Sequence, residues 1–138
     1  MNNQRVASPV PGVLDLLAAA RRGLSEAMIE SRAGERYAAA HLAALRGAAA
    51  VLAARTHPTS GRRGPRSAWE LLSQAAPEMT EWAAFFSAGA GKRAAAEAGI
   101  DVVTSREADD LLRDAETFLA LVDTTLGVPH QTALPRVS

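Results

Sequence analysis

The chain has 138 residues, no cysteine, and 15 acidic side chains against 15 basic ones. This length allows a single domain with a core of its own, and the lack of cysteine excludes disulfides and thiolate metal sites. Residues 1–66 carry a formal charge of +6 and residues 67–138 one of −6. Opposite charges favour packing of the two halves against each other. The alternative is that the basic half binds an acidic partner or nucleic acid.

The first twelve residues are predicted to be a disordered leader. They contain Pro9, Pro11 and Gly12 and show no hydrophobic periodicity. They also lack the apolar run of a signal peptide, and no segment approaches the roughly 20 consecutive apolar residues that span a bilayer. We therefore expect a cytoplasmic protein without a membrane partner.

From Val13 onward the pattern predicts an amphipathic helix. Its apolar residues recur at steps of three and four, and Arg21 falls outside them. The helix is expected to end between Ser31 and Gly34, with Gly34 providing the turn. The apolar stripe consists of Val13, Leu16, Leu17, Ala20, Leu24, Ala27 and Met28.

The central element is predicted to be a helix over Glu35–Arg55. Almost every position in it is apolar or small, so the helix must be covered on more than one side. One face carries small residues that would let another backbone approach closely, from a neighbouring helix or from a second subunit. That face consists of Ala40, Ala43, Gly47, Val51 and Ala54.

Residues 56–66 read THPTSGRRGPR, and their prolines and glycines predict a basic loop. The candidate nucleic-acid contacts are Arg55, Arg62, Arg63 and Arg66. If a phosphate backbone contacted all four, the logarithm of the binding constant would fall with the logarithm of the salt concentration with a slope of roughly −3 to −4. A merely solvated loop is the alternative, because no aromatic residue is interleaved for base stacking.

A helix restarts at Ser67, where Ser67 and Glu70 have the spacing of a capping box. Pro77 is expected to end or kink this helix and to lie in the first turn of the next one. Phe85 lies about 100° from its neighbour on the helical wheel, so the second helix is expected to be covered on two sides. The apolar stripe across both helices is Trp69, Leu72, Met79, Trp82, Ala83 and Phe86.

Residues 88–99 read AGAGKRAAAEAG and predict a weakly held helix, because Gly89 and Gly91 each cost about 1 kcal/mol relative to alanine. The GAGK string lacks the full spacing of a phosphate-binding loop and follows no predicted strand. A nucleotide site is therefore not expected here.

The last helix has clear boundaries. Thr104 and Glu107 form a second capping box, and Gly127 and Pro129 end the helix, so that residues 127–138 are predicted to be a disordered tail. The predicted core stripe is Ala108, Leu111, Leu112, Ala115, Phe118, Leu119, Val122 and Leu126. A solvated acidic face is expected at Asp109, Asp110, Asp114, Glu116 and Asp123, in preference to a metal site.

No stretch alternates with a period of two over the length of a strand. The predicted fold is therefore all-α, an antiparallel four- to five-helix bundle that forms one domain over residues 13–126.

The histidines limit the chemistry that this bundle can perform. His57 and His130 fall in predicted disordered segments, so an acid–base or metal site would have to be built around His41. No serine lies in a nucleophile elbow, and no metal or cofactor is expected. The spacing favours a partly buried His41 that donates to a hydroxyl or a carbonyl group.

Four strings of the chain carry a family resemblance: RYAAAHLAALRGAAAVL in the second helix, SAWELL and EWAAFF in the third, and READDLLRDAETFLALV in the last. Together they resemble a HEPN domain, the higher eukaryotes and prokaryotes nucleotide-binding domain. The likeness is to a small stand-alone actinobacterial branch, and it covers roughly Val13 to Leu126. The resemblance implies a bundle of four or five helices, and members of the superfamily commonly dimerise.

Many members of this superfamily are metal-independent ribonucleases with an Arg-x4–6-His motif near the end of the domain. Arg36 and His41 have that spacing, but they lie in the second helix. The last helix has Arg113 with Phe118, and no histidine, five residues on. Five residues also turn a helix by about 500°, which leaves two side chains about 140° apart.

The sequence therefore predicts a non-catalytic HEPN-like interaction module that is homodimeric and compatible with RNA or nucleotide association. The alternative is a metal-independent ribonuclease, in which His41 acts as acid or base and Arg36 stabilises a phosphorane-like transition state.

Overall fold

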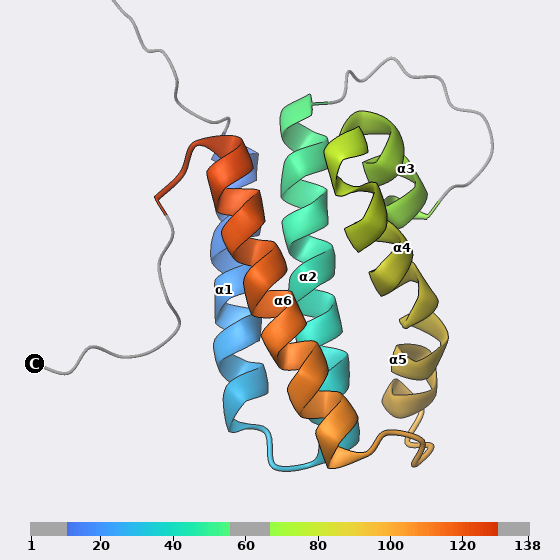
Figure 1. Cartoon of the computed structure of the whole chain (residues 1–138). Coiled ribbons are helices and arrows are strands. Elements are labelled where there is room, and N and C mark those ends of the chain that lie inside the picture. Colours follow the sequence, from blue (N-terminus) through green and yellow to red (C-terminus); the bar gives the residue numbers. More distant parts are fainter. Residues whose placement is uncertain (1–10, 56–66, 130–138) are drawn as a thin grey trace, which may run out of the picture.

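The computed structural model describes residues 11–55 and 67–129, and every regular element within them is helical (Figure 1). The prediction of an all-α fold is confirmed. The helices are α1 (Pro11–Ile29), α2 (Ala33–Arg55), α3 (Ala68–Ala75), α4 (Thr80–Ala88), α5 (Ala90–Glu97) and α6 (Ser105–Leu126), with a 3-10 turn, η1 (Pro77–Met79), between α3 and α4.

The chain runs up and down the long axis of a bundle. In Figure 1, α1 and α2 are antiparallel neighbours, α3 to α5 form a broken limb on the other side of α2, and α6 returns across the front. Because α3, η1, α4 and α5 together make one limb, this is the predicted four- to five-helix bundle.

Helix α2 is the centre of the bundle, as its composition predicts. It contacts α1, α3, α5 and α6. By length and composition alone α2 could cross a membrane, but half of its most apolar window is buried among these neighbours. Packing inside the bundle therefore accounts for its apolar character.

The small residues of α2 serve contacts within the chain. A Cβ placed on Gly23 of α1 would lie 3.5 Å from the Cβ of Ala43, and Leu119 of α6 packs directly onto Gly47. Ala54, which was expected on the same face, is exposed. Helices of the same chain thus occupy the face that the sequence also offered to a second subunit.

Both predicted capping boxes are present. The Ser67 Oγ accepts from the Glu70 N–H at 3.1 Å, and the Thr104 Oγ1 accepts from the Glu107 N–H at 3.0 Å. Each glutamate accepts in return from the N–H of its cap residue. Gly127 ends α6 in the left-handed region, at a φ of 71°.

The connection between α1 and α2 differs from the prediction. Helix α1 ends at Ile29, and Gly34 lies inside the first turn of α2 instead of forming the connection. The reason is that Arg36 donates to the carbonyl oxygens of Glu30 and Ser31. These carbonyl groups at the end of α1 are therefore hydrogen-bonded without a glycine turn.

Other boundaries also differ. Helix α1 begins at Pro11, two residues before the predicted start, because proline fits the first turn of a helix. The predicted helix over residues 88–99 is interrupted at Gly89, between α4 and α5. The rest of the predicted leader, residues 1–10, and most of the predicted tail, residues 130–138, lie outside the described residues.

The exposure of Asp123 and Met28 differs from the prediction. Asp123 was expected to be exposed, but it is 1% exposed and forms an ion pair with Arg21 of α1. Met28 was expected in the core, but it is 38% exposed near the end of α1. The helical period places Asp123 correctly beside the core stripe, and only the position of α1 decides that it is covered.

Candidate functional site

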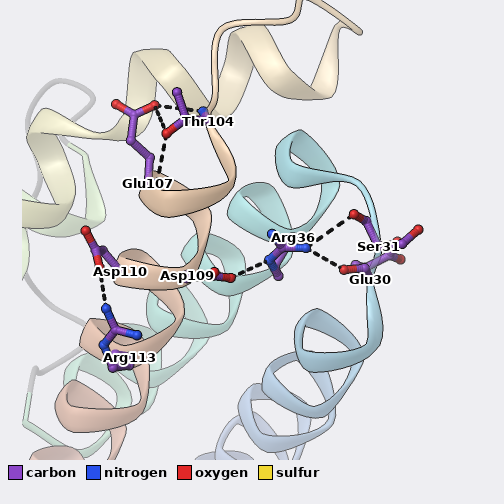
Figure 2. A network of polar contacts seen from close by, with 8 residues as sticks. All are labelled: Glu30, Ser31, Arg36, Thr104, Glu107, Asp109, Asp110 and Arg113. Atoms are coloured by element: carbon purple, nitrogen blue, oxygen red, sulfur yellow. Dashed lines mark hydrogen bonds and ion pairs between the residues drawn. The ribbon is translucent and has the colours of Figure 1, made fainter.

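Arg36, near the start of α2, connects three helices at one end of the bundle. Its Nη1 donates to the carbonyl oxygens of Glu30 at 2.8 Å and Ser31 at 3.4 Å, and its Nε lies 3.0 Å from Oδ1 of Asp109 on α6. Figure 2 shows the guanidinium between the α1–α2 connection and Asp109. The side chain is only 12% exposed, so its charge serves the joint between α1, α2 and α6.

His41 is fully buried in the middle of α2. Its Nε2 lies 2.8 Å from the carbonyl oxygen of Phe86. A carbonyl can only accept, so Nε2 carries the proton and donates it to Phe86. Of the two acceptors that the sequence predicts, a hydroxyl or a carbonyl group, the structure has the carbonyl, and the imidazole is fully buried where the prediction was partial burial.

Aromatic rings surround this imidazole. Tyr37 stacks on it at a centroid distance of 6.4 Å, and Trp69 and Phe86 approach edge-on at 6.0 and 5.8 Å. Burial lowers the pKa of His41, although its hydrogen bond to the Phe86 carbonyl opposes the shift. The imidazole is therefore held neutral at physiological pH.

Arg36 and His41 do not contact each other, and they are bound to different parts of the fold. Arg36 is engaged at the end of the bundle, and His41 is engaged with Phe86 in its interior. Their separation of about 140° on the helix matches these different surroundings. The ribonuclease reading of this pair stays a hypothesis, which an activity measurement has to decide.

A close approach that the sequence reading did not detect lies beside His41. A Cβ on Gly89 would stand 2.7 Å from the hydroxyl oxygen of Tyr37 and 3.5 Å from Cδ2 of His41. Burial raises the pKa of the Tyr37 hydroxyl, while nearby Lys92 opposes that shift. Gly89 is therefore required by packing, and a glycine inside an alanine-rich helical run was the available signal.

The candidate nucleic-acid contacts are only partly described. The Arg55 guanidinium lies 2.9 Å from a carboxylate oxygen of Glu78 and donates to the carbonyl of Ala75 at 3.3 Å. Arg62, Arg63 and Arg66 lie outside the described residues. Their contact with RNA stays a prediction.

Two of the surface grooves in the described part of the chain lie on α6, away from Arg36 and His41. One, of about 370 Å3, runs between α1 and the end of α6 and includes Leu14, Arg22 and the buried pair of Arg21 with Asp123. The other, of about 360 Å3, lies between α4 and α6 and is lined by Glu81, Trp82, Phe85 and Asp114. We call the second the α4–α6 groove.

Within the described part of the chain, no three acidic or histidine side chains gather in the way that a metal ion requires. Three acidic residues of α6 instead have separate basic partners: Asp109 pairs with Arg36, Asp110 with Arg113 and Asp123 with Arg21 (Figure 2 shows the first two).

Comparison with known families gives one result. A family model described as SAV_6107-like HEPN matches residues 27–123, from the last turn of α1 to the last turns of α6. No curated protein and no solved structure matches the chain significantly. The match includes all of α2 to α5, and with them Arg36, His41 and the α4–α6 groove.

Proposed function

Because this chain belongs to the SAV_6107-like HEPN family, we propose that it is a non-catalytic interaction module that forms homodimers in the cytoplasm. The observation that carries the proposal is the burial of His41, which is 0% exposed and has its Nε2 bound to the Phe86 carbonyl. A catalytic imidazole has to reach the substrate and exchange a proton with it. His41 would need the bundle to open before it could do either.

The alternative function is metal-independent RNA cleavage through Arg36 and His41. The test incubates the wild type and His41→Gln with a mixed pool of structured and single-stranded RNA in the presence of a chelator, and follows the products on a denaturing gel. Glutamine keeps an N–H donor for the Phe86 carbonyl, so this variant separates loss of catalysis from loss of the fold. Arg36→Lys, which keeps the charge, is the companion variant.

Intact RNA in all lanes is expected. Cleavage by the wild type that disappears in His41→Gln and Arg36→Lys, with thermal unfolding showing both variants folded, would establish the ribonuclease and overturn the proposal.

Homodimer formation is supported by exposed apolar side chains at one end of the bundle. Ile29, Ile100 and Val102 are 83%, 55% and 42% exposed. Figure 1 shows that the α1–α2 connection and the α5–α6 connection lie at the same end. Covering these side chains would remove apolar surface from water, which drives association of subunits.

Analytical ultracentrifugation over a range of concentrations tests the dimer. The double variant Ile29→Ser/Ile100→Ser is expected to dissociate at a concentration at least tenfold higher than the wild type. Leu71→Ser, a matched change on α3 at a side chain that is 38% exposed, should leave the dissociation constant unchanged. A wild type that stays monomeric at all concentrations would contradict the homodimer.

An association with RNA through Arg55, Arg62, Arg63 and Arg66 is part of the proposal. Its test is the salt dependence of binding to a single-stranded RNA, with an expected log–log slope of roughly −3 to −4 for the wild type. Replacing Arg62, Arg63 and Arg66 with alanine is expected to reduce that slope to about −1. An affinity and slope that stay unchanged would exclude this segment as the contact.

A further inference from the structure

The α4–α6 groove combines one exposed and one partly buried aromatic ring with carboxylates. Trp82 and Phe85 meet at an interplanar angle of 87° and a centroid distance of 6.0 Å, so their rings form two walls of a corner. Phe85 is 44% exposed. Glu81 and Asp114 complete the lining, one from α4 and one from α6.

The aromatic corner is held in place by the core beneath it. Trp82 stacks on Phe86 at 5.8 Å and 19°, and it also contacts the ring of Phe118 at 5.7 Å. Both supporting rings are fully buried. Trp82 is therefore a fixed part of the groove lining, and little side-chain entropy remains to be lost when a ligand contacts it.

The two carboxylates of the groove differ from their neighbours in lacking a basic partner. Glu78 is paired with Arg55, and Asp110 with Arg113. The side-chain carboxylates of Glu81 and Asp114 form no hydrogen bond or ion pair with any residue in the described ranges 11–55 and 67–129. Partial burial raises the pKa of Asp114, as does Asp110, while Arg113 opposes the shift. An added cation would offset this cost of burying the carboxylate.

Charge also indicates which occupant fits. A second copy related by a two-fold axis through the groove would bring Glu81 and Asp114 of one protomer towards the same carboxylates of the other, which is repulsive. A cation is attracted both by the faces of Trp82 and Phe85 and by the two carboxylates. A planar guanidinium can stack on a ring while its N–H groups donate in the ring plane to carboxylates, which a lysine ammonium does less well.

We propose that the α4–α6 groove binds an arginine side chain of a partner protein, held against Trp82 and Phe85 and paired with Glu81 and Asp114. This inference rests on the proposed function as an interaction module and names the chemistry of the partner that the module recognises.

The experiment titrates the peptide acetyl-Ala-Ala-Arg-Ala-Ala-amide into isotopically labelled full-length protein and follows NMR signals, including the indole N–H of Trp82. Saturable shifts confined to α4 and the facing part of α6 are expected. The same peptide with citrulline, which has the shape of arginine without its charge, should cause no saturable shift. A lysine peptide should bind more weakly than the arginine peptide.

Variants locate the binding site. Asp114→Asn and Phe85→Ala are each expected to lower the affinity for the arginine peptide by about two- to fivefold. Asp15→Asn, a matched change at an exposed position of α1, should leave the affinity unchanged. Equal binding of arginine and citrulline, or an affinity that Asp114→Asn does not change, would overturn the proposal.

Shifts of the same signals on dilution, without any peptide, would also overturn it by assigning the groove to a second copy of this chain. The RNA cleavage assay does not depend on any of these outcomes. A failure of the groove to bind arginine is therefore distinguishable from a failure of the proposed function.

Discussion

Leu119 of α6 fills the space above Gly47 of α2 in which a Cβ would have to lie, and Phe118 and Val122 are each 3.7 Å from that position. Gly47→Ala is therefore expected to force α2 and α6 apart. The cost of overpacking is about 1–3 kcal/mol, and a gain in helix propensity of about 1 kcal/mol offsets part of it. Urea unfolding should therefore show a net loss of up to about 2 kcal/mol.

Gly91→Ala is the matched control for this variant. Gly91 lies inside α5 with nothing within 4 Å of a Cβ placed on it. The control should raise the free energy of unfolding by about 0.5–1 kcal/mol. A Gly47→Ala protein that gains as much stability as Gly91→Ala would show that α2 and α6 do not meet at this glycine.

The buried ion pair of Arg21 with Asp123 gives a second prediction. Asp123→Asn leaves the Arg21 guanidinium, which is 19% exposed, without the charge of its partner. Because Arg21 keeps some access to water, the expected loss of about 2–3 kcal/mol is below that of a fully buried pair. The double variant Arg21→Met/Asp123→Leu should recover most of this loss, because it removes both charges.

Asp110→Asn provides the control for the ion pair in urea unfolding. Its partner Arg113 is 69% exposed, and Asp110 itself is 50% exposed. The change in free energy of unfolding should stay within about 0.5 kcal/mol. Equal effects of Asp123→Asn and Asp110→Asn would contradict the burial of the first pair.

The neutral His41 imidazole makes stability depend on pH. Burial lowers its pKa in the folded state below the ordinary value of 6.5. At pH values between the lowered pKa of the folded state and 6.5, the unfolded chain binds a proton that the folded chain does not. The free energy of unfolding is therefore highest above pH ~6.5 and falls as the pH decreases. The slope from this one group reaches at most about 1.4 kcal/mol per pH unit.

Urea unfolding at several pH values between about 5 and 8 measures this slope, and His41→Gln should flatten it. His57 and His130 are present in both proteins, so their contributions cancel in the comparison. An identical slope in wild type and variant would show that His41 titrates in the same way in both the folded and unfolded states.

Glu107 produces a dependence of the same sign at lower pH. Its carboxylate accepts from Lys92 Nζ at 2.6 Å and from the backbone N–H of Thr104, and these interactions, Lys92 first, lower its pKa below the ordinary 4.5. The stabilisation is present above pH ~4.5 and is lost as the pH falls through the lowered pKa.

Glu107→Gln keeps an acceptor for the Thr104 N–H and removes the charge. The variant should show a smaller decrease of stability between pH ~5 and ~3 than the wild type, measured by urea unfolding. Glu70→Gln is the matched control, because Glu70 occupies the same capping position before α3 and has no lysine partner among the described residues. If both variants behave alike, the contact with Lys92 contributes nothing measurable.

Local chemistry allowed the sequence to predict much of the fold. The capping pairs, Pro77 and Gly127 fix helix boundaries through interactions with residues close by in the chain. The helical period likewise identified the core of α6. These features need no knowledge of how the helices are arranged.

Several errors in the prediction concern contacts between distant segments. The burial of Asp123 depends on the position of α1, where its partner Arg21 lies. Arg36 is held in place by Asp109 of α6. Gly89 is needed because the Tyr37 hydroxyl of α2 lies close to it. The α4–α6 groove was missed for the same reason, since Phe85 and Asp114 are brought to one surface only by packing. Hydrophobic periodicity does not contain that information.

The ring cluster around Phe86 has a consequence for optical measurements. The chain has six Phe, Trp and Tyr residues, and their rings, with His41 among them, form one connected cluster that joins α2, α3, α4 and α6. Helix α1 contributes no aromatic residue. Tryptophan fluorescence therefore monitors one side of the bundle and does not directly report the detachment of α1, whereas far-ultraviolet circular dichroism detects both. A difference between their unfolding midpoints would measure how independently α1 separates from the rest.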